Sequence, residues 1–393
     1  MTKCVYCGNN PTPHFLNWFN ETITVFMTPI NQVIFGKKFG KGIFRTISWL
    51  FFPVLRLMEK TNIITYVSEM SAVTSSRAEV LWSEAKRRGL KMECVKICGR
   101  ENDSYRVWIG DRFIYFSGLP RPEYMPNTGE WWIDDKALVK EKLLKAGIPV
   151  PNGKAFSRYR PLKKMFEKLE KPVIIKPRLG SRGRHTTTFI YTEEQLKKAF
   201  KVAKQLCYWV VMEEHLIGSV YRGTMIDGKL AGVLRGDPPR ITGDGTHNMR
   251  ELVEIKNKNK HPEIHDVKIS PEMEIFLSRT NRNLDDILPA GLTIDLSEKI
   301  GVSYGGNSSE DTEITHPEIK RILEEAAVAI NDPLIGFDFI IEHIDRSPDE
   351  QKWGIIECNG VPFINLHHDP IEGPSNNVAK HVWDFVEKNA AYY

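Results

Sequence analysis

The fold of this chain is decided by two apolar runs, GFDFII at residues 336–341 and WGIIECN at residues 353–359. A short polar segment joins them, which predicts a β-hairpin. If the turn is symmetric, Asp338 lies opposite Glu357, and Asn359 falls on the same face because side chains alternate along a strand. Carboxylate and amide oxygens are the ligands that Mg²⁺ prefers. A strand face open to solvent would show the same alternation, so the spacing alone leaves both interpretations open.

A basic, glycine-containing loop is the second signal. The run KPRLGSRGRH at residues 176–185 joins predicted strands at 171–177 and 186–191. Glycine lets backbone N–H groups approach phosphate oxygens, and Lys176 at the end of its strand supplies a positive charge. The segment matches neither the P-loop nor the GxGxxG pattern. A glycine-containing hairpin with solvated basic residues is the alternative.

Two weaker signals flank that loop. Lys136 lies in the first turn of a predicted helix capped by Asp134. The helix dipole disfavours a cation at this position. A phosphate-facing role would explain it, although the neighbouring acids could simply offset the charge. Glu213 and Glu214 end a predicted strand, where a carboxylate and backbone groups could contact an adenine edge, or could lie exposed.

Other elements follow from local patterns. We expect helices, each with a serine or threonine cap or an amphipathic repeat, at residues 76–88, 193–206, 317–330 and 375–387. The turn residues Gly110-Asp111 and Asp227-Gly228 predict two further hairpins.

Composition excludes several classes of protein. The chain has 393 residues, of which 41% are hydrophobic and 26% are charged. These values are typical of a globular protein of two or three domains rather than a disordered or fibrous one. The net charge of +4 is too even to indicate a nucleic-acid partner. Six cysteines and no secretory signal favour a reduced, cytoplasmic setting.

The N-terminal segment, residues 1–60, is basic, with seven Lys or Arg against two Glu. Within it, residues 42–58 are apolar but interrupted by two arginines and a proline, and are too short to span a membrane. This stretch could lie on an anionic membrane surface. The alternative, which we favour, is a hydrophobic arm that packs on the body of the protein or on a partner subunit.

The cysteines offer one candidate metal site. Cys4 and Cys7 resemble half of a zinc knuckle, and Cys94 and Cys98 could form the other half. Free reduced thiols are the alternative.

Taken in order, these segments resemble the ATP-grasp ligases. Three further stretches, TGDGTHNMRELVE at 242–254, EITHPE at 313–318 and GPSNNV at 373–378, are similar to the branch that contains cyanophycin synthetase and bifunctional glutathione synthetase. The resemblance implies an α/β (α+β) chain with the ATP-grasp fold, in which ATP is held between two α+β subdomains after a small pre-grasp α/β domain. It covers residues 131–393 and leaves 1–60 without a match.

The implied domains are a basic amphiphilic segment at 1–60, a pre-grasp domain at 61–130 and an ATP-grasp domain at 131–393. The last divides into a nucleotide-binding part at 131–210 and a central, metal-binding part at 211–393. The resemblance implies a carboxylate–amine ligase that acts on an amino acid or peptide through an acyl phosphate. A phosphotransferase and a catalytically reduced ATP-binding module are the alternatives.

The resemblance also implies site residues and partners. ATP contacts are expected at Lys136, Lys176, Gly180, Ser181, Arg182, Gly183, Glu213, Glu214 and Leu216. Mg²⁺, or Mn²⁺, is expected at Asp338, Glu357 and Asn359, and Arg235 and Arg250 are the catalytic candidates. The chain departs from the pattern at Val220, where an acid usually holds the ribose, and at Gly301 in the substrate loop. We further expect small-molecule substrates, no nucleic acid, and a homo-oligomer.

Overall fold

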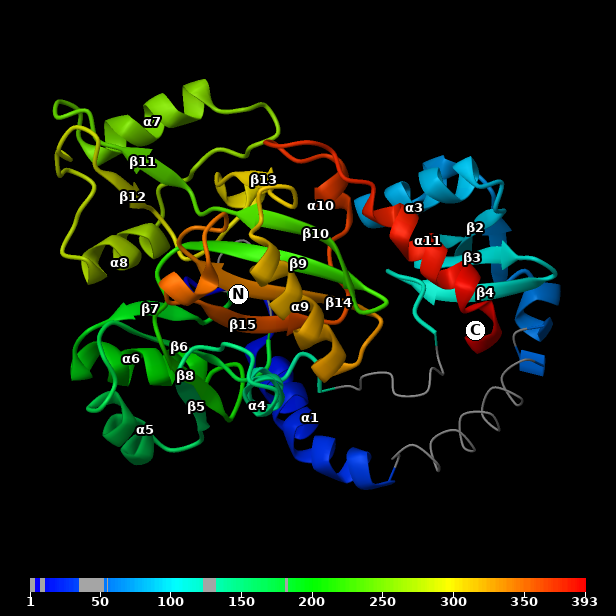
Figure 1. The fold of residues 1–393 in the computed structure, drawn as a ribbon, viewed down its shortest axis with the longest axis horizontal. Coiled ribbons are helices and arrows are strands. Elements are labelled where there is room, and N and C mark those ends of the chain that lie inside the picture. The colour runs from blue at the N-terminus through cyan, green and yellow to red at the C-terminus, as the bar shows by residue number, and fades with distance from the viewer. Residues whose placement is uncertain (1–3, 8–10, 35–52, 55, 123–131, 181–182) are drawn as a thin grey trace.

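The computed structural model describes residues 4–7, 11–34, 53–54, 56–122, 132–180 and 183–393. These residues form four sheets (Figure 1). Within the described ranges, no helix is long and apolar enough to cross a membrane. Residues 42–52 and 55 fall outside these ranges, and with them most of the predicted hydrophobic arm.

A four-stranded antiparallel sheet comes first along the chain, with its strands in sequential order. Helices α3 (Ser76–Arg87) and α11 (Val378–Lys388) pack against each other beside it. Ser75 caps α3 by accepting a hydrogen bond from the Ala78 backbone N–H, as the sequence predicts. The strands are β1 (Ile64–Val67), β2 (Met92–Ile97), β3 (Arg100–Ile109) and β4 (Arg112–Ser117).

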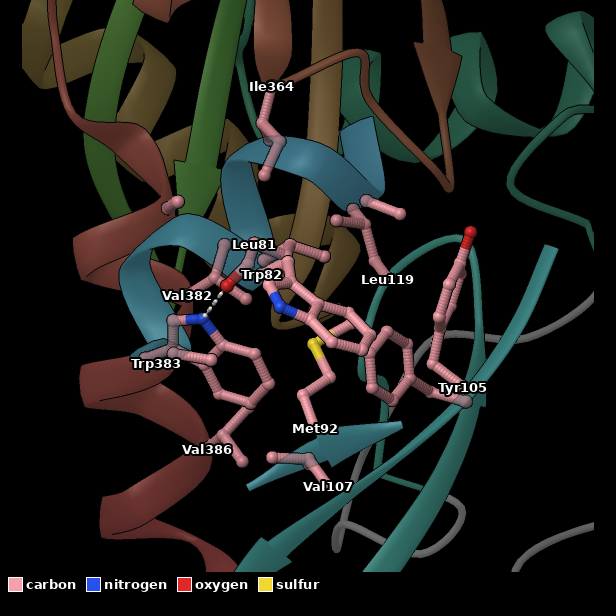
Figure 2. Packing of buried hydrophobic residues seen from close by; sticks show 14 of the residues in the cluster. Leu81, Trp82, Met92, Tyr105, Val107, Leu119, Ile364, Val382, Trp383 and Val386 are labelled. Carbon is pink, nitrogen blue, oxygen red and sulfur yellow. Dashed lines mark hydrogen bonds between the residues drawn. The ribbon is translucent and has the colours of Figure 1, made fainter. Parts of the chain in front are cut away.

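The helix predicted at 375–387 is confirmed as α11. Its packing against α3 of the first sheet's unit is not predicted by the sequence. Trp383 is fully buried, and its indole N–H donates to the Leu81 carbonyl at 2.9 Å (Figure 2). Arg88, at the end of α3, forms ion pairs with Asp384 and Glu387 at 2.7 and 2.5 Å. This helix near the end of the chain therefore completes the core of the first sheet.

The second sheet carries the basic loop. Its antiparallel strands lie in the order β5-β8-β6-β7, with α5 (Tyr159–Phe166) and α6 (Glu193–Ala203) packed against them. The helix predicted at 193–206 is α6, and a capping box formed by Thr192 and Gln195 satisfies backbone N–H groups at its start. The strands are β5 (Gly153–Phe156), β6 (Val173–Pro177), β7 (Thr187–Ile190) and β8 (Val210–Glu214).

The central sheet has the order β13-β10-β9-β14-β15 and holds the decisive hairpin. Helix α9 (Pro317–Ile330) and helix α4 (Lys136–Lys145) cover one of its faces (Figure 1). Because Val139 and Leu143 of α4 share a core with Phe337 and Phe339, α4 packs on this sheet rather than on the second one. The strands are β9 (Ser219–Ile226), β10 (Lys229–Gly236), β13 (Ser308–Glu310), β14 (Leu334–Ile341) and β15 (Gly354–Asn359).

Smaller elements complete the described chain. β11 (Arg240–Thr242) and β12 (Thr293–Asp295) pair beside α7 (Met249–Asn259) and α8 (Pro271–Arg279), which have a core of their own. α10 (Asn365–His368) follows the central hairpin. Single-turn helices lie at Met70–Ala72, Val302–Tyr304, Pro348–Glu350 and Ala390–Tyr392.

Helix α1 (His14–Ile34), within the unmatched segment, packs on the second sheet's unit. Asn17 donates to the Leu206 carbonyl at 3.2 Å, and the Thr22 hydroxyl accepts from the Tyr208 N–H at 3.2 Å. The Phe26 ring meets Trp209 edge to face at 4.9 Å. The N-terminal segment is thus tied to the residues directly before β8, the strand that ends at Glu214.

Candidate active site

The predicted pairing of the two acids is confirmed. In the β14–β15 hairpin, Asp338 pairs with Glu357, and the Asn359 side-chain amide donates to Asp338 Oδ2 at 3.2 Å. The hairpin is not symmetric throughout, because a bulge directly after Asp338 leaves the extra residue, Ile356, unpaired. Three oxygen-bearing side chains therefore converge on one face at the end of the central sheet.

Arg222 on β9 completes this cluster and was missed by sequence reasoning. Its guanidinium donates to both oxygens of Asp338, at 2.6 and 2.7 Å. The strand register places the two residues directly opposite each other. The missing signal is the pairing of β9 with β14, two strands separated by more than a hundred residues, which no local pattern reveals.

Lys136 and Lys176 reach the same face from two different elements. Lys136 Nζ lies 2.7 Å from the Gly180 carbonyl and 3.8 Å from Glu357 Oε2. Lys176 Nζ lies 3.2 Å from the carbonyl of Ile356, the bulged residue. Two buried ammonium groups thus face the acidic hairpin across the interior.

The cap of α4 needs a correction. Asp135, not Asp134, accepts from the backbone N–H groups of Ala137 and Leu138, at 3.0 and 3.2 Å. Asp135 also binds Arg178 at 2.8 Å. Asp135, the acid next to Lys136, therefore already has partners in the helix N-terminus and in Arg178.

Glu213 is buried between two lysines. Lys176 approaches one of its oxygens at 2.8 Å, and Lys140 approaches the other. Burial opposes ionisation of this carboxyl, but Lys176 and Lys140 outweigh it and hold the pKa of Glu213 below its usual range, since nearby positive charge favours the ionised form. The carboxylate that we predicted to contact adenine therefore also orients Lys176.

Glu357 is in the opposite electrostatic position. Burial raises the pKa of its carboxyl above the usual range; Lys136 opposes this shift, and Asp338 adds to it. Arg222 pairs closely with Asp338, whereas Lys136 approaches Glu357 only to 3.8 Å, so the charge of Glu357 is the less well compensated of the two. The donor set, two carboxylates and an amide, fits a Mg²⁺ ion that would supply the remaining charge.

A cavity of about 940 Å³ separates the second sheet from the central sheet. Its volume is large enough for a nucleotide together with a second ligand. It is lined by the predicted residues Lys136, Lys176, Gly180, Gly183, Glu213, Glu214, Leu216, Asp338, Glu357 and Asn359, and also by Val220, Arg222, Lys299 and Gly301. Ser181 and Arg182 of the predicted set lie outside the described residues.

Glu214 and Leu216 line this cavity beside Glu213, but the Glu214 carboxylate is engaged elsewhere. It binds Lys352 at 2.7 Å and accepts from the Asn152 N–H at 2.8 Å. Its backbone, rather than its charge, is what Glu214 offers to a ligand.

The two catalytic candidates, Arg235 and Arg250, lie away from the other predicted site residues. Arg235 and Arg250 are not among the described residues that line the cavity. Arg235 is held by Asp237 and Glu372 at 3.2 and 3.1 Å, and Arg250 on α7 lies 3.6 Å from Asp285. Arg222 is the guanidinium that meets the acidic hairpin.

The four-thiolate zinc site is wrong. Cys94 pairs with Val67 in the first sheet, and Cys98 follows directly after β2. Cys4 and Cys7 instead lie against His185, at the end of the basic loop. Cys94 and Cys98 belong to the first sheet's unit, whereas Cys4 and Cys7 lie in a turn beside the basic loop, so the four thiols do not meet.

The arrangement of sheets around this site is that of the ATP-grasp fold. The structure superimposes on the bifunctional glutathione synthetase from Pasteurella multocida with a TM-score of 0.52 and 24% identity, over 79% of this chain and 44% of that one. This likeness establishes the shared fold, as the sequence resemblance predicts. No established family profile matches the chain.

The sequence is also similar to curated proteins of glutathione and cyanophycin synthesis. The sequence is 28% identical to the glutathione biosynthesis bifunctional protein GshAB of Listeria innocua, over 84% of this chain and 43% of that protein. It is 30% identical to the cyanophycin synthetase of Crocosphaera subtropica, over 64% of this chain and 30% of that one. The chain thus spans less than half of the length of these relatives.

Proposed function

We propose that this protein is an ATP- and Mg²⁺-dependent ligase that joins a carboxylate to an amine, with an amino acid or peptide as a substrate. The observation that carries the proposal is the convergence of Asp338, Glu357 and Asn359 with Lys136 and Lys176 around one cavity. Two carboxylates with bound Mg²⁺ and two buried lysines are what a triphosphate needs in order to bind and to lose its γ-phosphoryl group.

The side chains would divide the work as follows. Lys136 and Lys176 bind phosphate oxygens, and the backbone around Gly180 and Gly183 follows them. Asp338, Glu357 and Asn359 would hold the Mg²⁺, which would neutralise charge on the phosphates. Glu213 keeps Lys176 in place and shares its carboxylate with the adenine amino group.

The reaction has two balanced steps. A substrate carboxylate oxygen forms a bond to the γ-phosphorus while the bond between that phosphorus and the β,γ-bridging oxygen breaks, which gives an acyl phosphate and ADP. The amine nitrogen then bonds to the acyl carbon, phosphate leaves, and the amine loses a proton. Arg222, which already binds one carboxylate, is our candidate for stabilising negative charge near the reacting groups.

The domain limits inferred from the sequence remain part of this proposal, as do a cytoplasmic setting, peripheral membrane contact through residues 42–58, and a homo-oligomer. The exposed apolar residues of α1 are compatible with a covered surface at this end of the molecule. They include Phe15, Leu16, Phe19 and Phe26.

The test is ADP release with Mg·ATP against pools of amino acids and short peptides. We expect release to need both a carboxylate and an amine, and Glu357→Gln to lower it by roughly 10²–10³-fold, because an acidic metal ligand is lost. Glu342→Gln, an exposed acid just after β14, is the matched control and should retain activity.

Other outcomes would redirect the proposal. ADP release that needs a hydroxyl acceptor instead of an amine would identify a phosphotransferase. ATP binding with no release against any pool would favour the ATP-binding module.

A further inference from the structure

Four metal-binding side chains meet where the N-terminal segment touches the basic loop. Cys4, Cys7, His14 and His185 each direct one sulfur or nitrogen atom inward, and these four atoms all lie within 4.8 Å of one another. Cys7 and His185 are fully buried, and the other two are partly buried. Two thiols and two imidazoles are a donor set typical of structural zinc.

Three of the six separations between these atoms are close to those around a tetrahedral ion. Cys7 Sγ lies 3.2 Å from His14 Nε2 and 3.4 Å from His185 Nε2, and Cys4 Sγ lies 3.5 Å from His185 Nε2. Zinc bonds of ~2.0–2.3 Å place tetrahedral ligand atoms roughly 3.3–3.8 Å apart. The two cysteines follow a C-x₂-C spacing, and all four cluster residues lie in described parts of the chain.

The orientation of His185 points to a metal rather than to hydrogen bonds alone. Its Nδ1 lies 2.8 Å from the Val202 carbonyl. A carbonyl can only accept, so Nδ1 carries the proton. The lone pair on Nε2 therefore faces both sulfurs, and a single lone pair can accept from only one thiol. A backbone carbonyl that fixes the outer nitrogen is the usual support of a metal-binding histidine.

We propose that Cys4, Cys7, His14 and His185 bind one zinc ion, which fastens the N-terminal segment to the loop that borders the nucleotide cavity. With four protein ligands the site is closed, so its role is structural. His185 directly follows the loop residues that line the cavity, and its backbone N–H donates to the Tyr6 carbonyl at 3.1 Å. The ion would hold the end of this loop in place, with α1 as the support behind it.

The first test is metal content. The full chain, without a histidine tag, is purified from zinc-supplemented medium in the absence of chelators. We expect about one zinc per chain by mass spectrometry, and only background zinc in Cys7→Ser. Cys94→Ser is the matched control, because it replaces another buried cysteine, in the first sheet, and should keep the ion.

A second measurement covers the case in which Cys7→Ser fails to fold. The demetallated wild-type chain is titrated with Co²⁺, and we expect the visible bands of tetrahedral cobalt with thiolate ligands. His14→Gln, which changes a partly buried residue at the start of α1, should alter those bands while circular dichroism stays the same.

A third measurement addresses the loop. Hydrogen exchange at residues 183–187 should quicken when zinc is chelated in the wild type and in Cys94→Ser. Wild-type protein with only background zinc and no thiolate–cobalt bands would overturn the proposal, as would zinc that is retained in both Cys7→Ser and His14→Gln. Iron or copper in place of zinc would overturn the assignment of the metal.

Discussion

Asp338 faces a guanidinium on one side and the position expected for a cation on the other. Arg222 contacts both of its oxygens, whereas the ion pair of Glu357 beside it, with Lys136, is longer at 3.8 Å. The cluster is therefore built to be stable before a ligand binds and to accept more positive charge afterwards. This asymmetry between the two acids can be tested separately from turnover.

Replacing Arg222 by Met should cost about 3 kcal/mol of folding free energy without ligand, because the partly buried Asp338 carboxylate loses its partner. The deficit should shrink with Mg·ATP, which brings positive charge to the same oxygens. Urea unfolding with and without Mg·ATP measures both values. Arg321→Met, which replaces an exposed arginine on α9, is the control. It should change stability by no more than about 0.5 kcal/mol, as is usual for surface substitutions. An equal Arg222→Met deficit under both conditions would contradict this role.

Glu84 makes the first sheet's unit sensitive to acid. Hydrogen bonds from Arg87, together with Arg88 and Asn377, outweigh burial and lower the pKa of this carboxyl from 4.5 to about 2. Because the folded value lies below the unfolded one, the stabilisation is present above pH 4.5 and is lost as the pH falls toward 2. The difference corresponds to about 3 kcal/mol. Glu84→Gln should flatten the pH dependence of unfolding in this window, whereas Glu79→Gln, an exposed acid on the same helix, should leave it as in the wild type.

At the scale of elements, the turn into β9 requires a glycine. Gly218 has a φ of +130°, and a Cβ there would lie 2.3 Å from the Ile341 carbonyl oxygen of the neighbouring strand. We expect Gly218→Ala to cost about 2 kcal/mol or more, since both the backbone conformation and the strand contact are disturbed. Gly228→Ala is the control, because its φ is +74° with open space around it. Only the conformational cost of about 1 kcal/mol applies there. Chemical denaturation compares the two, and equal losses would rule out the strand contact as a cause.

Hairpins were predictable from the sequence because their information is local. The Asp227-Gly228 turn and the opposition of Asp338 and Glu357 both follow from a few adjacent residues. Arg222 and the packing of α11 were not predictable in this way, because each depends on contacts between segments far apart in the sequence. Cys4 and Cys7 stood out in the sequence, but their partners His14 and His185 did not, since 178 residues separate Cys7 from His185. Local sequence patterns thus predict individual helices and hairpins, whereas the binding sites form only when distant segments pack together.

At the scale of the whole molecule, the cavity lies between the second sheet and the central sheet, and no described residue of the first sheet lines it. A ligand that fills it should stabilise the second and central sheets together. We expect Mg·ATP at a hundred times its dissociation constant to add about 2.7 kcal/mol to the free energy of unfolding. Hydrogen exchange should slow in β6 and β15 but not in β3, which lies in the first sheet. Protection spread equally over all three sheets would indicate a binding mode other than the proposed one.

The position of α11 in the sequence also affects when the first sheet can fold during synthesis on the ribosome. The first sheet is complete at Ser117, but the helix that covers its core starts at Val378, about 260 residues later. At ~5–20 residues per second, the nascent sheet waits roughly 13–50 s for Trp383 to arrive. During that time the apolar surface around Leu81 and Trp82 is open to chaperones, and its exposure ends only when synthesis has passed α11.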